Sequence, residues 1–277
     1  MGQPRFLVKN FFSRRIYPAH VLLPSEELAG NEMSRIGNGN RDPLDFWTTT
    51  TANLEATGRV DDAVSRAADM VVIDRGHNLA SKQVVLERSA NGTTWTTVVD
   101  VTIPSASAPG ALSDANGVVN REGAWLKTFA SASDRYWRLR IPAMGVGLKP
   151  QVVNAWLDTS WAPPYRDTPD APDAHELGAQ EITMQTGWIA RSHIWVRRRG
   201  HIGLRLEDSD YDVALEQIQY QFGINRPMWI VHDEARADHA VLALPVLGTI
   251  EILRRSPDWF GPRVAFDWLE HAPKEAA

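Results

Sequence analysis

The polar residues best placed to do chemistry occupy residues 74–78, directly after a short apolar run rich in β-branched side chains. A loop histidine beside an acidic residue can act as a general base or contact a ligand. The alternative is structural, with Asp74 and Asn78 bonded to the backbone of their own turn and His77 packed at its edge. We favour the structural interpretation and keep Arg75, His77 and Asn78 as weak candidates for ligand binding.

A second group of polar residues brackets a loop near the C-terminus. His232-Asp233 and Asp238-His239 could converge on a metal ion, but they lack the regular spacing and second ligand shell typical of zinc sites. A solvated turn is the favoured interpretation. We therefore expect no metal and no cofactor.

The one concentrated basic run is the arginine triplet at residues 197–199. At the period of a β-strand its side chains divide between two faces, so they form no continuous patch. An exposed sheet edge protected by charge is the favoured explanation. A subunit contact comes second and a phosphate contact third.

The sequence holds 11 tryptophans, whose ring faces can stack on sugars. Three of them fall in alternating strand patterns and are assigned to the core, namely Trp137, Trp156 and Trp268. The pattern leaves open the roles of Trp161, Trp188 and Trp259.

No catalytic motif stands out. The chain lacks the Gly-x-Ser-x-Gly, His-Glu-x-x-His, phosphate-loop and dinucleotide fingerprints. Carboxylate pairs for glycoside cleavage need not be adjacent in sequence, and no pair is conspicuous. We expect no enzymatic activity and assign no catalytic residue.

The amino-acid composition limits the kinds of partner that we expect for this chain. A net charge of −5 argues against nucleic-acid binding, and the absence of cysteine fits folding in a reducing compartment. The N-terminus lacks the apolar core of a secretion signal, and the longest apolar stretch, residues 240–253, is too short to span a bilayer. We expect neither a nucleic-acid partner nor membrane insertion.

The polar residues at 74–78 must be positioned by β-strands in the first half of the chain. Residues 70–73, 83–88 and 93–101 read as strands, with Asn91-Gly92 as a tight turn that accepts positive φ at both positions. Trp95, Thr97 and Val99 are expected on one face of the third strand. Residues 123–129, 134–141 and 152–157 add further strands, 60–68 a short helix or turn, and 104–117 a surface loop. In residues 134–141, alternation predicts a buried face of Trp137, Leu139 and Ile141 and a basic outer face of Tyr136, Arg138 and Arg140.

The fold class is mainly β: a jelly-roll β-sandwich at residues 1–160, a proline-rich linker at 161–178 and a smaller α+β, split-barrel-like domain at 179–277. The second domain is expected to contain strands and one helix, which begins near Ser209 and ends at Gly223. The predicted strands of this domain are 188–199, 201–207, 227–231, two within 241–253 that are separated near Gly248, and one around 264–268.

Residues 71–79 and 85–95, with Arg135-Tyr136-Trp137-Arg138-Leu139, resemble the galactose-binding-like, or discoidin-type, sandwich. In that family a Ser-x-Asp-Gly-x-x-Trp hairpin carries aspartate where this chain has Asn91. The resemblance implies a fold whose members bind glycans or lipids through loops at one end, or are purely structural.

Residues 186–192, 211–223 and 225–231 are similar to the tail-tube-like domain of the distal tail proteins of tailed bacteriophages. This resemblance implies a structural subunit of a phage or phage-like virion, in the tail or tail tip. Such a subunit would form a homo-oligomeric ring, contact other tail proteins and be made in the cytoplasm of a bacterial host. The alternative is an adhesion module that recognises host-surface glycans. A third hypothesis, an unrecognised hydrolase, has no candidate carboxylate pair.

Overall fold

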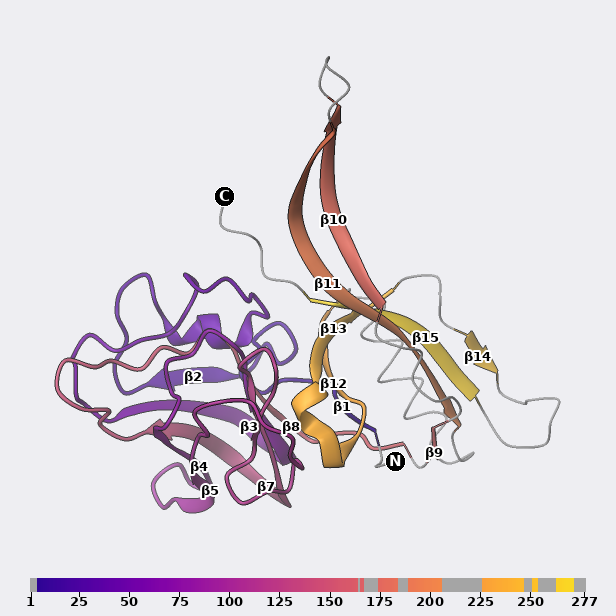
Figure 1. The fold of residues 1–277 in the computed structure, drawn as a ribbon. Coiled ribbons are helices and arrows are strands. Elements are labelled where there is room, and N and C mark those ends of the chain that lie inside the picture. Colours follow the sequence, from indigo (N-terminus) through magenta and orange to yellow (C-terminus); the bar gives the residue numbers. More distant parts are fainter. Residues whose placement is uncertain are drawn as a thin grey trace. The chain divides into compact units, whose positions relative to one another are not determined.

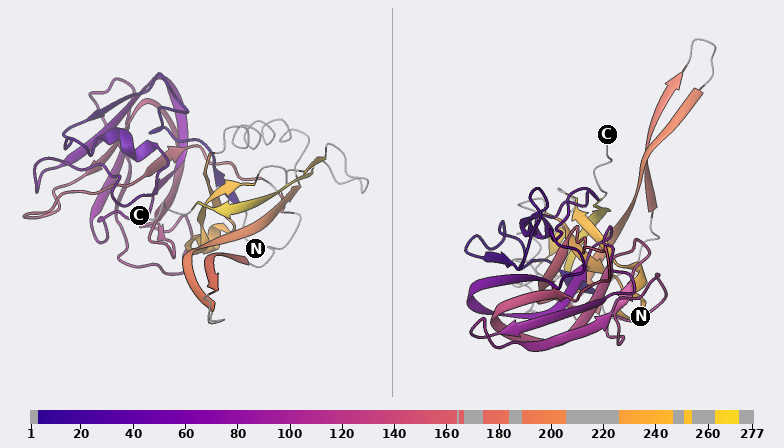
Figure 2. Two further views of the ribbon diagram at one scale, coloured as in Figure 1. Left: turned by 90° about the horizontal axis from the view of Figure 1, so that it is seen from above. Right: turned by 90° about the vertical axis from the view of Figure 1, so that its left-hand side faces the viewer.

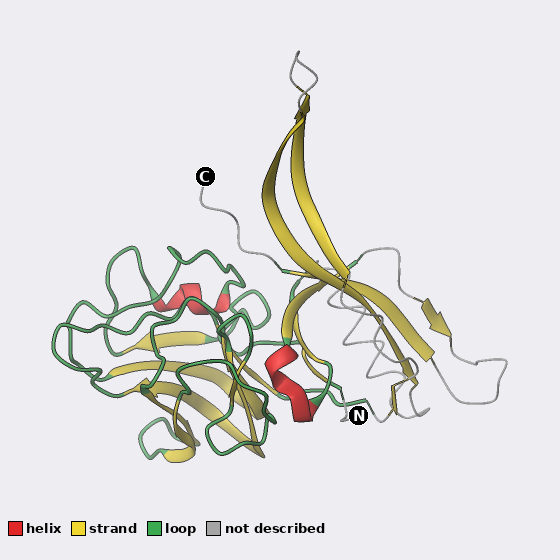
Figure 3. Ribbon diagram, in the orientation of Figure 1, coloured by secondary structure: helices red, strands yellow, loops and turns green. Residues whose placement is uncertain are grey.

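The computed structural model describes residues 4–163, 165–166, 174–183, 189–205, 226–246, 251–253 and 263–271. The chain divides into two units, the first made of Met1–Ala162, Trp229–Ala240 and Pro273–Ala277, and the second of Pro163–Met228 and Val241–Ala272 (Figure 1). The described residues are mainly strand, which confirms the predicted fold class (Figure 3). No described helix is long and apolar enough to cross a membrane.

Two long strands build the sheet of the first unit. β3 (Ala56–Ile73) and β7 (Trp125–Ile141) pair antiparallel along most of their length, with register shifts at Asp61/Arg66 and Ala68/Met70. Extra residues at such shifts bend and twist a strand. One half of the pair lies between β2 (Val21–Pro24) and β4 (Gln83–Ser89), which is followed by β5 (Thr96–Thr102). At the other end, β8 (Ala155–Asp158) pairs with β3 and β6 (Val118–Val119) pairs with β7.

One hydrophobic core lies between the two halves of this bent sheet. It takes Trp137 and Leu139 from one half of β7, and Trp125 from the other half together with Val71 of β3. The predicted alternation in residues 134–141 is confirmed, since Trp137, Leu139 and Ile141 are buried while Tyr136, Arg138 and Arg140 are half-buried. Trp156 and Trp268 are buried as predicted.

Two expectations about these strands are wrong. Residues 60–68 form neither helix nor turn but the middle of β3, and residues 125–129 and 134–141 belong to the single strand β7. The reason is a pairing of small residues across the bend, with Ala67 opposite Ser133 and Ala68 opposite Ala132. Residues 60–68 and 125–141 contain no glycine or proline that would end a strand.

The turn between β4 and β5 also differs from the prediction. Gly92 has a positive φ of 74°, whereas Asn91 does not have a positive φ. The Asn91 side-chain oxygen instead accepts hydrogen bonds from the backbone N–H groups of Thr93 and Thr94, each 2.9 Å long. This wider Asx-type loop delays the start of β5 to Thr96.

A register shift between Leu86 and Glu87 then separates the side chains that were predicted to share a face of this strand. Thr97 is exposed and Val99 is buried.

The first unit also contains β1 (Arg5–Leu7), which pairs antiparallel with β12 (Met228–Val231). Two short 3₁₀ helices, η1 (Met33–Gly37) and η2 (Glu234–His239), complete its described elements.

The second unit has the strand order β13 (Val241–Pro245), β15 (Arg263–Glu270), β11 (Ile189–Arg205) and β10 (Ala174–Thr183). β14 (Glu251–Leu253) pairs with β15, and β9 (Tyr165–Arg166) pairs with β11. The two strands expected within residues 241–253 and the one around 264–268 are confirmed. The helix predicted between Ser209 and Gly223 lies outside the described residues, as do Trp188 and Trp259.

Two predictions for the second unit are wrong. The strands expected at 188–199 and 201–207 are one strand, because Gly200 does not break β11. It lies opposite Trp268, whose ring would be 2.7 Å from a Cβ at this position. Parts of the predicted linker also pair as strands, since the backbone of Tyr165 and Arg166 forms β9 and β10 begins at Ala174.

The hairpin of β10 and β11 extends well past β15, the strand that pairs with β11 (Figure 2). β15 pairs with β11 from Arg199 to Arg205, whereas residues 189–198 pair with β10 alone among the described strands. We call residues 174–183 and 189–198 the arm. The edge interpretation of the arginine triplet is wrong for Arg199, which has a strand partner on each side. Arg198 lies 3.6 Å from the Glu270 carboxylate.

Candidate functional sites

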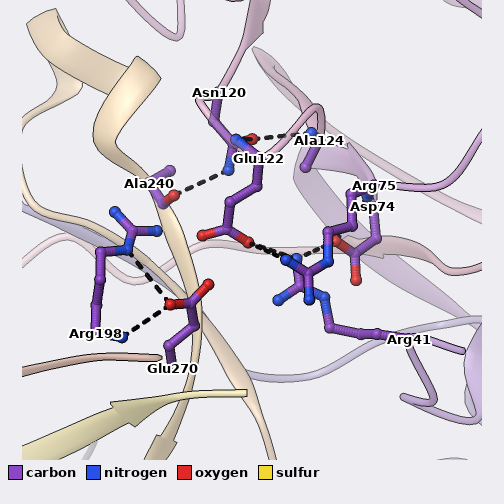
Figure 4. A network of polar contacts seen from close by, with 9 residues as sticks. All are labelled: Arg41, Asp74, Arg75, Asn120, Glu122, Ala124, Arg198, Ala240 and Glu270. Atoms are coloured by element: carbon purple, nitrogen blue, oxygen red, sulfur yellow. Dashed lines mark hydrogen bonds and ion pairs between the residues drawn. The ribbon is translucent and has the colours of Figure 1, made fainter. Parts of the chain in front are cut away.

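A buried ionic network lies where β3 ends and β7 begins (Figure 4). The Arg41 guanidinium donates to Asp74 and to Glu122, at 2.8 Å each, and the side chains of Arg41 and Asp74 have no exposed surface. Arg75 approaches the same Glu122 carboxylate at 3.5 Å. Desolvation acts to lower the pKa of Arg41, but the two carboxylates outweigh it and raise that pKa. The network thus fixes charged groups in place.

A later segment of the chain covers this network. Arg41 lies 5.9 Å from the ring centre of Trp229, the Asn120 amide donates to the Ala240 carbonyl at 2.9 Å, and the Leu112 N–H donates to the Glu234 carbonyl at 3.0 Å. Residues 229–240 therefore close this end of the sandwich.

The structure gives each predicted candidate a definite partner. Arg75 faces Glu122, as described above. Asn78 donates to the Lys149 carbonyl and accepts from the Gln151 N–H, both at 2.8 Å, rather than bonding its own turn. The structural interpretation was therefore wrong in its detail for Asn78, whose partners come from a neighbouring loop. Asp74 does bond its own turn, through the N–H of Arg75, but its main partner is the distant Arg41.

His77 is held as a neutral side chain. Its Nδ1 accepts a hydrogen bond from the Leu79 N–H at 3.0 Å, and its Nε2 is buried without a hydrogen-bond partner among the described residues. Burial lowers the His77 pKa to about 4, with the Gly123 backbone acting weakly in the opposite direction. Whether Arg75, His77 and Asn78 touch a ligand stays a prediction.

The residues considered for a metal site are also placed. Asp233 caps η2 by accepting from the Ala235 N–H at 2.8 Å, while His239 Nε2 lies 3.4 Å from Asp238 and 2.8 Å from an Arg121 guanidinium nitrogen. Across the parts of the chain that the structure describes, no three His, Asp or Glu side chains group as metal ligands do.

A second titratable cluster ties the N-terminal segment to the sandwich. His20 contacts the Asp62 carboxylate through Nε2 and the Phe11 carbonyl through Nδ1 at 2.8 Å, and Tyr17 stacks on its ring. The Tyr17 hydroxyl donates to Asp158 at 2.9 Å. Burial raises the pKa of Asp158 to about 7, and burial with the nearby Asp158 raises the pKa of Tyr17. Both His20 nitrogens are engaged, so the cluster holds structure together.

These shifts predict how stability depends on pH. Asp158 has a higher pKa folded than unfolded, so its contribution is complete below about pH 4 and is lost as pH rises through 7. His77 has a lower pKa folded, so its contribution is complete above about pH 6.5 and is lost as pH falls toward 4. Below pH 6.5 the two groups change stability with pH in opposite directions. Above pH 6.5 the fall in stability caused by Asp158 remains.

We therefore expect wild-type stability to fall by less than about 1 kcal/mol as pH rises from 6.5 to 8, and Asp158→Asn to remove that fall. Urea unfolding at several pH values measures it. The exposed-site control Asp100→Asn should keep the wild-type slope. An unchanged slope in Asp158→Asn would contradict the assignment.

A group of arginine and aromatic side chains lies on the outer face of the sheet of the first unit. The Arg138 guanidinium lies 4.1 Å from the ring centre of Trp95, and Arg135 and Arg59 lie 4.8 Å and 5.8 Å from that of Tyr136. Both aromatic residues are half-buried. The 90–95 loop folds against Tyr136, because a Cβ on Gly92 would lie 3.4 Å from its ring.

A buried carboxylate anchors the arginines of this face. Glu87 contacts the Arg138 guanidinium and accepts from Arg140 at 3.3 Å, and Arg135 donates to Asp61 at 2.8 Å and 3.0 Å. We call the following residues the outer-face patch: Arg59, Glu87, Trp95, Tyr136, Arg138 and Arg140. The alternation of β7 predicted its basic residues, but the approach of Trp95 depends on the loop and was missed.

The chain matches no family model and no curated protein. Among solved structures it resembles the family 32 carbohydrate-binding module of the NanJ protein of Clostridium perfringens, solved with galactose (14% identity, 56% of this chain and 98% of that chain covered, TM-score 0.40). It also resembles a family 32 module from a family 31 glycoside hydrolase of the same organism (12%, 50% and 90%, 0.38). A third is chitosan-binding module 1 of a chitosanase/glucanase from Paenibacillus sp. IK-5 (17%, 54% and 98%, 0.40). These structural neighbours are carbohydrate-binding modules of the galactose-binding-like type.

Proposed function

We propose that the first unit is a carbohydrate-binding module without catalytic activity and that its ligand lies on the outer-face patch. The observation that carries the proposal is the pair of half-buried rings, Trp95 and Tyr136, each with a guanidinium held against it. An aromatic ring presents a flat apolar face to the C–H face of a sugar, and a fixed guanidinium offers several N–H donors to its hydroxyls.

The patch is favoured over the loop end that residues 74–78 occupy. At that end Asn78 uses both ends of its amide on backbone groups, and residues 229–240 lie over the Arg41 network. A sugar there would have to displace contacts that the fold already makes. On the patch, Trp95 and Tyr136 are only partly buried.

The carboxylates beside the rings support binding rather than catalysis. Glu87 is buried against Arg138 and Arg140, and hydrogen bonds from Arg135 lower the pKa of Asp61. Both carboxylates are engaged by guanidiniums. They orient the arginines.

A glycan array that includes galactose, followed by calorimetry on the best ligand, tests the proposal. Trp95→Ala and Tyr136→Ala should each weaken binding about tenfold or more, because buried aromatic contacts dominate such interfaces. Trp95→Phe should retain part of the affinity. Asn78→Ala, at the loop end, should bind as the wild type does. Loss in Asn78→Ala with full binding in Trp95→Ala would contradict the outer-face site, and an array without signal would contradict the function.

The arm favours a second candidate, a self-associating structural subunit of a phage-like virion. A two-stranded ribbon is marginally stable alone in water, and each of its edges offers unpaired N–H and C=O groups to another strand. Residues 189–198 have such an edge among the described strands. A neighbouring copy could cover it, as a ring in the tail or tail tip requires.

This candidate is tested by shortening the arm. Glu176 and Arg197 face each other in the hairpin, so an Asn-Gly turn can replace residues 177–196 without changing the register. Native mass spectrometry over a wide concentration range should show closed oligomers for the full chain and monomers for the shortened one. Monomers of both at every concentration, or equal oligomers of both, would contradict a role for the arm in assembly.

A further inference from the structure

Positive charge is concentrated within the outer-face patch. Arg59 of β3 and Arg138 of β7 are directly opposite in the ladder, and Glu87 of β4 is opposite Arg138 on the other side. Like charges in directly opposite positions destabilise a sheet. Here Glu87 serves both Arg138 and Arg140, so one buried carboxylate is shared by two guanidiniums, while Arg59 lies on the opposite side of Arg138.

The two neighbouring carboxylates reduce this excess of positive charge but leave Arg59 without an ion pair among the described residues. Glu55 pairs with Arg140 at 3.1 Å and is exposed, and Asp61 pairs with Arg135. The hydrogen bond from Arg135 is the main reason that the pKa of Asp61 is lowered, and the charge of Arg59 contributes little to it. None of these carboxylates forms an ion pair with Arg59.

Arg59 itself is poorly satisfied for a half-buried arginine. Among the described residues it makes one long hydrogen bond, 3.4 Å from Nη1 to the Gly92 carbonyl, and its Nε is buried without a hydrogen-bond partner. Its guanidinium lies near the Tyr136 ring, where a stacked sugar is proposed to sit. An arginine with spare donors beside an aromatic ring suits a planar oxyanion, which can accept two parallel N–H bonds.

We infer that the ligand of the outer-face patch is an acidic glycan, a uronic-acid oligosaccharide, whose carboxylate pairs with Arg59. This inference rests on the proposed carbohydrate-binding function and adds the charge of the sugar. Tyr136 and Trp95 would contact sugar faces, and Glu87 would keep Arg138 in place while the bound carboxylate balances Arg59. Binding should weaken as salt concentration rises, since a partly exposed ion pair is screened.

The test compares a uronic-acid oligosaccharide with the same oligosaccharide after methyl esterification, which removes the charge and keeps the sugar faces. By calorimetry, the wild type should bind the acid about tenfold or more tightly than the ester. Arg59→Gln should bind the two equally, at the affinity of the wild type for the ester. Arg59→Lys, which keeps a charge but not the fork, should recover only part of the difference. Arg14→Gln, at an exposed position of the N-terminal segment, is the control and should behave as the wild type.

The outcomes separate the two claims. Equal affinity of the wild type for acid and ester, with Trp95→Ala weakening both, would overturn the acidic-glycan inference and leave carbohydrate binding intact. A preference for the acid that persists in Arg59→Gln would overturn the role of Arg59. Absence of binding to either sugar, together with an array without signal, would overturn both claims. Circular dichroism and thermal unfolding of Arg59→Gln and Arg59→Lys establish that each variant is folded before its affinity is compared.

Discussion

Replacing Arg41 by methionine should lower the free energy of unfolding of the first unit by roughly 3–5 kcal/mol. Arg41 is fully buried and is the shared partner of Asp74 and Glu122. Methionine fills a similar volume but removes the shared partner of two carboxylates in a dry site, where Arg75 lies 3.5 Å from Glu122. An uncompensated buried charge, rather than lost packing, is therefore the main cost. Urea unfolding followed by tryptophan fluorescence measures it.

Two comparisons isolate that cause. Arg88→Met breaks a half-exposed pair with Asp134, 2.6 Å apart, and should cost about 1 kcal/mol or less. Adding Asp74→Asn and Glu122→Gln to Arg41→Met should restore a large part of the loss, because neutral amides are cheaper to bury than carboxylates. If Arg41→Met were no more harmful than Arg88→Met, the network would not stabilise the fold as described.

Gly37→Ala should cost roughly 3 kcal/mol or more, near the upper end of what overpacking causes. Gly37 is buried in η1 with ordinary backbone angles, so the cost is one of space. An added Cβ would overlap the carbonyl group of Phe12 and lie 2.8 Å from the Ser13 nitrogen. The clashing atoms belong to the backbone, which cannot rotate away from the added methyl group as a flexible side chain can. The backbone of η1 and that of Phe12 and Ser13 must therefore move apart.

Gly30→Ala is the matched control for Gly37→Ala. Gly30 has a φ of 85°, but nothing lies within 4 Å of an added Cβ, so the change should cost only about 1 kcal/mol for the left-handed backbone. Differential scanning calorimetry should show a drop in Tm of roughly 10 °C for Gly37→Ala and a few degrees for Gly30→Ala. Equal drops would show that the close approach at Phe12 relaxes freely.

Sequence patterns predicted the fold class and many of the strands because alternation records which face a side chain takes. Trp137, Leu139 and Ile141 lie in the core as their spacing indicated. The same reasoning failed where a strand continued through a bend, as in β3 and β7, because pairing with a partner strand overrode the weak local pattern.

The candidate sites were only partly predictable, since they join residues that are distant in sequence. Arg41 and Asp74 are 33 positions apart, and Arg41 and Glu122 are 81 apart, so no local spacing could reveal the network. The outer face of β7 was predictable from its alternation. The arrival of Trp95 beside Arg138 depended on a loop whose geometry follows from the side chains of Ser89 and Asn91.

The first unit combines residues 1–162 with residues 229–240, and this affects how it folds during synthesis on the ribosome. The contacts of Trp229, Glu234 and Ala240 with the sandwich form only after the polypeptide between residues 163 and 228 has been made. At roughly 5–20 residues per second, the emerging sandwich waits several seconds with the Arg41 network uncovered. During this period the Arg41 network of the nascent domain is open to chaperones, and a transcript truncated before codon 229 would yield a sandwich in which the network stays uncovered.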